Sequence, residues 1–103
     1  MSTKPDAFLV TFDTTQMSRE ALIQAIDEIP EIVNWYAFLP AAVCVVSELS
    51  TFELSRAIRM RLPDLRFILV RMEKGERQGW LPKSAWQFIR NPRPADSVDT
   101  AAE

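Results

Sequence analysis

The sequence predicts a small α+β domain, in which two helices cover one face of a four-stranded antiparallel sheet. Three observations predict this class. Runs of apolar, β-branched and aromatic residues alternate with stretches whose apolar residues recur at helical spacing. A serine that can cap a helix precedes each of two helical stretches. The tripeptide LPA joins the second and third strand-like runs, and so short a connection indicates an antiparallel hairpin.

The predicted elements follow one another as strand, helix, strand, strand, helix and strand. The first helix has Ser18 as its N-cap and is stopped by Pro30, and the second begins with a capping box of Ser50 and Glu53. The four strands are predicted at residues 7–13, 32–38, 41–48 and 65–72. With right-handed crossovers, this βαββαβ order gives the ferredoxin-like arrangement.

A third, short helix is predicted at residues 83–90, because Pro82 suits a first helical turn and Pro92 ends the pattern. We therefore expect one ferredoxin-like domain over residues 1–91, with the C-terminal helix included. Residues 92–103 are polar and proline-containing, and we expect them to form a mobile tail.

The composition excludes several classes of site. The chain has no histidine, so it has no histidine-based catalytic triad and no histidine-bound zinc. Cys44 is the only cysteine and lies in an apolar run, where we expect a buried side chain. Gly75 and Gly79 are the only glycines, so the chain has no glycine-rich loop for a nucleotide cofactor.

The sheet face away from the two helices is predicted to be apolar, although such a face normally meets water and is polar. An exposed apolar patch usually marks an interface. We expect the aromatic C-terminal segment, from the same chain or from a twin, to cover it in a face-to-face homodimer. The alternative role for the tryptophans is a platform on which nucleobases stack. The residues predicted at the dimer interface are Leu9, Trp80, Leu81, Trp86 and Ile89.

The net charge of −2 hides an uneven distribution. Residues 1–50 carry two bases against seven acids, whereas residues 51–94 carry ten bases against four acids. A basic half can form a phosphate-binding surface, and a solvated face is the competing interpretation. The residues predicted to bind nucleic acid are Arg56, Arg59, Arg71, Lys74, Arg77 and Lys83.

Asp13 is the candidate catalytic and metal-binding residue. It ends the first strand and precedes Thr14 and Thr15, where a carboxylate often caps a turn. In a dimer, two copies of Asp13 near the two-fold axis would offer oxygen ligands to one Mg²⁺ or Mn²⁺. Both interpretations stay open at this point.

Four motifs suggest a family. They are TFD at the end of the first strand, WY in the second strand, LS at the start of the second helix, and the closing GWLPKSAWQFI. Together they resemble a family of short bacterial hypothetical proteins labelled SinR-like, over residues 7–91. The wider group is similar to ferredoxin-like CRISPR-associated endoribonucleases and antitoxin endoribonucleases.

The resemblance implies a homodimer in which the first-strand aspartate, here Asp13, binds a metal for phosphodiester hydrolysis. The chain departs from the family pattern at Ala37, because the family has a histidine after the aromatic pair. This departure puts catalysis in question, whereas fold and dimerisation transfer more safely.

Two functions are therefore expected. The first is a non-catalytic module, of the CRISPR-associated or toxin–antitoxin type, that binds RNA or a partner protein. The alternative is a metal-dependent endoribonuclease with Asp13 as the ligand of Mg²⁺ or Mn²⁺; no other cofactor is expected. The longest apolar run, residues 35–46, contains Pro40 and is shorter than the roughly 20 residues that span a membrane. We therefore expect a cytoplasmic protein with no membrane partner.

Overall fold

The computed structural model describes residues 4–95. Its elements, in chain order, are β1 (Asp6–Phe12), α1 (Arg19–Asp27), β2 (Ile32–Leu39), β3 (Ala42–Ser47), α2 (Thr51–Arg61), β4 (Phe67–Arg71) and α3 (Lys83–Arg90). This order confirms the predicted βαββαβ sequence of elements followed by a C-terminal helix.

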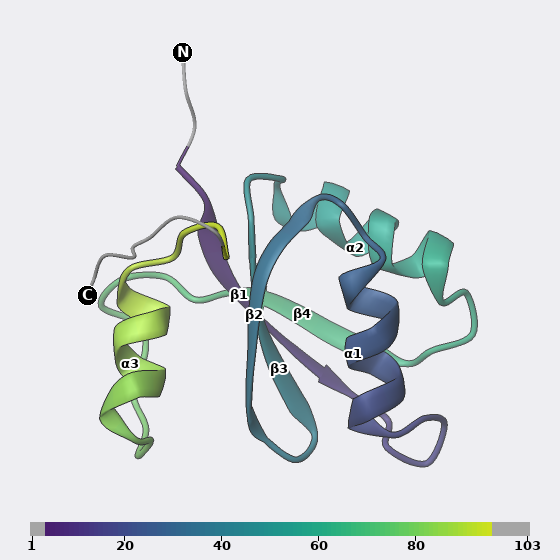
Figure 1. Ribbon diagram of the computed structural model, residues 1–103, viewed down its shortest axis with the longest axis horizontal. Helices are drawn as coiled ribbons and strands as arrows, with labels where there is room; N and C mark the ends of the chain where they lie inside the picture. Colours follow the sequence, from purple (N-terminus) through teal and green to yellow (C-terminus); the bar gives the residue numbers. More distant parts are fainter. Residues whose placement is uncertain (1–3, 96–103) are drawn as a thin grey trace.

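The four strands form one antiparallel sheet in the order β2-β3-β1-β4. Val10 of β1 pairs with Val43 of β3 on one side and with Leu69 of β4 on the other, so β1 is an inner strand. Helices α1 and α2 lie on one side of the sheet, and α3 lies on the opposite side (Figure 1). The topology is the predicted ferredoxin-like one.

Local signals start the two long helices where the sequence predicts. The hydroxyl of Ser18 accepts a hydrogen bond from the amide of Ala21 at 3.1 Å, and this satisfies a donor that the helix leaves unpaired. Ser50 and Glu53 form the complete capping box, with both bonds at 3.1 Å.

The main core lies between the sheet and helices α1 and α2. Phe8 and Val10 of β1 are fully buried, and the alternating residues Leu9 and Thr11 are only half-buried because they face the other side. The other fully buried side chains of this core are Val43 and Val45 of the neighbouring strand β3, and Leu22, Ile26, Leu54 and Ile58 of the two helices.

Strand β4 is shorter than predicted, because it runs over Phe67–Arg71 rather than over residues 65–72. The amide of Leu65 donates to the carbonyl of Leu62 at 3.3 Å, and the amide of Arg66 donates to the side chain of Gln16 at 2.7 Å. These two amides are therefore not available to a strand ladder, and only the carbonyl of Arg66 pairs with β1, by accepting from the amide of Asp13 at 3.0 Å.

Helix α3 folds back over the second face of its own sheet. Ile89 is 1% exposed and packs with Ala7 and Cys44. Cys44 is itself buried, and its burial raises the pKa of its thiol to about 12. Leu81 and Trp86 are partly buried in the same cluster. Three of the five residues predicted at a dimer interface thus pack within one chain.

Among the described residues 4–95, the other half of the second face remains exposed. We call it the open face, and we define it as Leu9, Thr11, Ile68 and Val70, which pair across β1 and β4. Ile68 is 65% exposed and Val70 is 46% exposed, an unusual exposure for such side chains in a sheet. Trp80 is 98% exposed, in the loop that precedes α3.

The chain after α3 returns to the edge strand β2. The side-chain amide of Asn34 donates to the carbonyl of Arg93 at 3.2 Å, and the amide of Ala95 donates to the carbonyl of Val33 at 2.9 Å. The rest of the predicted mobile tail, residues 96–103, lies outside the described residues. Within residues 4–95, no helix has the length and apolar character needed to cross a membrane.

Candidate nucleic-acid interface

A cleft with many basic side chains lies where the start of β1, the turn after β4 and the end of α3 meet. Its volume is about 580 Å³. We call it the basic cleft, and we define it by five cations among its lining residues: Lys4, Arg71, Lys74, Arg77 and Arg90.

The sheet and a tight turn place the first three cations together. Because β1 and β4 are antiparallel neighbours, Phe8 pairs with Arg71, and the amide of Met72 donates to the carbonyl of Ala7 at 2.9 Å. The chain before β1, with Lys4, therefore runs beside the chain after β4. Gly75 then adopts a φ of 85° in a turn closed by the Glu76 amide, and this turn carries Lys74.

Arg77 connects this turn to α3. Its Nη1 donates to the carbonyl of Ile89 at 3.2 Å, so a cation satisfies one of the carbonyls that a helix C-terminus leaves free. Arg90 follows directly, with its guanidinium carbon 5.9 Å from the centre of the Trp86 ring. These contacts fix the C-terminal end of α3 against the cleft.

The cleft has a net positive charge even when its acidic side chains are included. Asp6 and Glu73 also line it, and each lies 3.8 Å from the guanidinium of Arg71. Lys4, Lys74 and Arg90 have no ion pair with any other residue of the range 4–95. Three cations are therefore left for an anionic ligand.

The structure brings three of the six predicted nucleic-acid-binding residues together, namely Arg71, Lys74 and Arg77. Arg56 and Arg59 line a separate hollow of about 290 Å³ on α2. Lys83 begins α3, whereas the basic cleft is lined by the last two residues of that helix, Ile89 and Arg90. Lys4 and Arg90 were missed from sequence. The strand order would have indicated Lys4, because antiparallel pairing places the start of β1 beside the end of β4.

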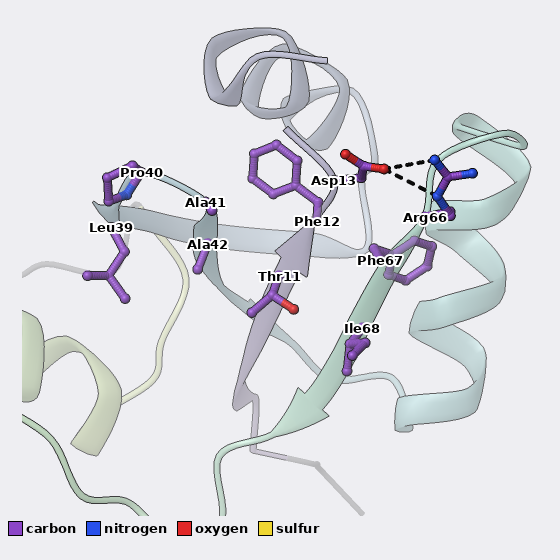
Figure 2. Close-up of a pocket in the computed structure, with 10 residues that line it drawn as sticks. All are labelled: Thr11, Phe12, Asp13, Leu39, Pro40, Ala41, Ala42, Arg66, Phe67 and Ile68. Carbon is purple, nitrogen blue, oxygen red and sulfur yellow. Dashed lines mark hydrogen bonds and ion pairs between the residues drawn. The ribbon is translucent and has the colours of Figure 1, made fainter. Parts of the chain in front are cut away.

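Asp13 lies at the opposite end of β1, beside a groove of about 630 Å³ with Leu39, Pro40 and Ile68 among its lining residues (Figure 2). Its Oδ1 accepts from the amide and the hydroxyl of Thr15, at 2.9 and 2.5 Å. Its Oδ2 accepts from Nε and Nη2 of Arg66, at 3.2 and 2.9 Å.

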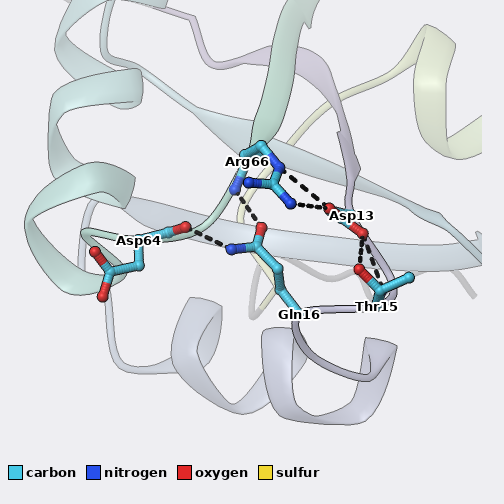
Figure 3. A network of polar contacts seen from close by, with 5 residues as sticks. All are labelled: Asp13, Thr15, Gln16, Asp64 and Arg66. Carbon is cyan, nitrogen blue, oxygen red and sulfur yellow. Dashed lines mark hydrogen bonds and ion pairs between the residues drawn. The ribbon is translucent and has the colours of Figure 1, made fainter.

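These contacts hold the turn after β1 against the start of β4. Gln16 completes the connection, because its side chain donates to the carbonyl of Asp64 at 2.7 Å and accepts from the amide of Arg66 (Figure 3). The pKa of Asp13 lies below its ordinary value, first because of the hydrogen bonds from Thr15 and then because of Arg66. Asp13 thus has the turn-capping role that the sequence left as one alternative.

The residues around Asp13 do not match the donor set of a Mg²⁺ or Mn²⁺ site within one chain. Such ions take several oxygen ligands, and here both carboxylate oxygens accept hydrogen bonds, two of them from an arginine. No group of three or more acidic or cysteine side chains that could hold a metal occurs within residues 4–95. Sharing of a metal by two copies of Asp13 stays a prediction.

Comparisons with protein-family models, with curated proteins and with solved structures find no match.

Proposed function

We propose that the protein is a non-catalytic module that binds nucleic acid through the basic cleft. The observation that supports this most is the convergence of five cations from three segments. Three of them, Lys4, Lys74 and Arg90, have neither an ion pair nor a side-chain hydrogen bond to another residue of the range 4–95. Phosphate contacts supply most of the affinity of sequence-independent nucleic-acid binding, and arginine and lysine make most of them. Because the overall net charge is −2, we assign such binding to this local basic surface and not to the charge of the whole molecule.

The contacts of Asp13 favour a binding role over hydrolysis. A metal would have to compete with Arg66 for Oδ2 and with Thr15 for Oδ1. The SinR-like resemblance and its CRISPR-associated or toxin–antitoxin setting stay predictions, as does the cytoplasmic location.

We also propose that the module is a homodimer that pairs through the open face. Ile68 and Val70 lie side by side with Leu9 across two strands, and a second copy offers the same apolar surface. A two-fold axis through such a patch makes it self-complementary in composition. Of the predicted interface residues, Leu9 belongs to this patch and Trp80 is exposed; Ile89 is buried by its own chain.

Binding of a fluorescein-labelled single-stranded RNA of about 15 nucleotides, measured by anisotropy in about 50 mM salt, tests the function. We expect Lys74→Glu/Arg90→Glu to weaken binding by about tenfold or more, because it reverses two cations of the cleft. The control Arg56→Glu/Arg59→Glu makes the same charge change on α2 and should weaken binding far less. An equal effect of both variants, or no binding by the wild type, contradicts the proposal.

The endoribonuclease alternative has its own test. The same RNA is incubated with Mg²⁺ or Mn²⁺ and with the wild type or Asp13→Asn. Binding without cleavage by either protein supports the module, whereas cleavage by the wild type that Asp13→Asn abolishes overturns the non-catalytic assignment.

A further inference from the structure

A second cleft adjoins the basic cleft across the last turn of α3. Its volume is about 590 Å³, within the range of small-ligand sites, and it shares Arg90 and Asn91 with the basic cleft. We call it the polar cleft, and we define it by the lining residues Asn34, Tyr36, Ser84, Gln87, Phe88, Arg90, Asn91 and Arg93. The two clefts therefore form neighbouring surfaces on either side of one helix end.

The wall of the polar cleft is partly aromatic, and hydrogen bonds connect the segments that form it. The rings of Tyr36 and Phe88 meet edge to face with centroids 5.3 Å apart, and the hydroxyl of Tyr36 lies 3.0 Å from that of Ser84. The side chain of Asn34 donates to the carbonyl of Arg93 and accepts from the amide of Trp35. These contacts join β2, α3 and the segment after α3 into one continuous surface.

Two amide side chains on this surface are free to meet a ligand. Gln87 and Asn91 are exposed, and neither side chain makes a hydrogen bond to another residue of the range 4–95. An amide offers both donors and an acceptor, a combination that matches the edges of nucleobases. Arg90 and Arg93 supply positive charge on the same surface.

We propose that the ligand is single-stranded nucleic acid, whose backbone lies in the basic cleft while one unpaired nucleobase enters the polar cleft. This inference rests on the proposed function and names its substrate class. Base edges inside a duplex are paired, whereas an unpaired base can be splayed out and contacted by amides and aromatic walls. One strand that crosses the end of α3 reaches both clefts, because Arg90 and Asn91 line both.

The test compares labelled single-stranded RNA, an abasic strand of the same length and a duplex of the same sequence. The variant is Gln87→Ala/Asn91→Ala, and the matched control is Gln24→Ala/Gln78→Ala, which removes two exposed amides outside both clefts. Circular dichroism confirms that each variant is folded. We expect the variant to weaken binding of the single strand by about tenfold. Binding of the abasic strand should fall by less than about twofold, because the variant removes none of the five cations of the basic cleft.

We also expect the wild type to bind the duplex about tenfold more weakly than the single strand. Equal affinity for duplex and single strand, or an equal effect of variant and control, overturns the base site. If Lys74→Glu/Arg90→Glu still weakens binding in that case, the basic cleft stands and only the base site fails. If the wild type binds none of the three ligands, both the nucleic-acid-binding function and the base site are overturned.

Discussion

At the scale of single residues, Asp13 caps the turn after β1, which is one of the two roles that the sequence left open. Two of its four hydrogen bonds, from Thr15, close the turn after β1, and the other two, from Arg66, connect this turn to the start of β4. All four favour the charged form. The sequence could place Asp13 at a strand end beside threonines. It could not show Arg66 there, because that contact depends on the pairing of β1 with β4.

Asp13→Asn should destabilise the protein in a pH-dependent way. The pKa of Asp13 is lower in the folded chain than its ordinary value of 3.8. The carboxylate therefore adds stability that is fully present above about pH 4 and is lost as the pH falls through the folded pKa. The melting temperature of the wild type should exceed that of Asp13→Asn at pH 7, and the difference should shrink at pH values well below 3.8. A difference that does not change with pH contradicts this role.

At the scale of elements, the predictions that the structure confirms rest on local sequence signals. Ser18, Ser50 and Glu53 start the helices where predicted, and α3 has the predicted bounds because Pro82 and Asn91 flank its amphipathic stretch. The start of β4 was predicted two residues too early, because the side chain of Gln16 takes the amide of Arg66. A partner 50 positions away in the chain leaves no local pattern.

The packing of α3 against the sheet can be tested with one substitution. Ile89→Ala removes a side chain that is 1% exposed between α3 and the sheet. We expect the free energy of unfolding in urea to fall by about 2–5 kcal/mol, the usual cost for a buried aliphatic side chain.

The control for this test is Ile68→Ala, which makes the same chemical change at a side chain that is 65% exposed. At low protein concentration it should change the free energy of unfolding by less than about 0.5 kcal/mol. Equal effects of the two substitutions would show that α3 does not pack on its own sheet.

The basic cleft contains residues that the local sequence indicated and residues that only the tertiary fold brings there. Arg71, Lys74 and Arg77 could be named from sequence, because they follow one another around the end of the fourth strand. Arg56 and Arg59 could not be separated from them, since only the tertiary fold places α2 on the other face of the sheet (Figure 1). Arg90 enters the cleft because α3 runs back across the second face.

At the scale of the whole molecule, the open face predicts self-association. We expect the wild type to sediment as a dimer and Ile68→Glu/Val70→Glu to sediment as a folded monomer. In a dimer of this variant, the two carboxylates of each copy would be buried against the open face of the other copy. The control is Phe52→Glu/Met60→Glu, which adds the same charges at exposed apolar positions of α2 and should remain dimeric. A monomeric wild type, or dissociation in both variants, contradicts a dimer through this face.

The charge distribution of the molecule leads to the most direct measurement, which is the salt dependence of binding to single-stranded RNA. With three to five cations of the basic cleft on phosphates, the logarithm of the affinity should fall against the logarithm of the salt concentration with a slope of about −2 to −3.5. Lys74→Gln/Arg90→Gln should make this slope shallower by about 1.4. A slope near zero, or one that this variant leaves unchanged, would contradict binding of nucleic acid at the cleft.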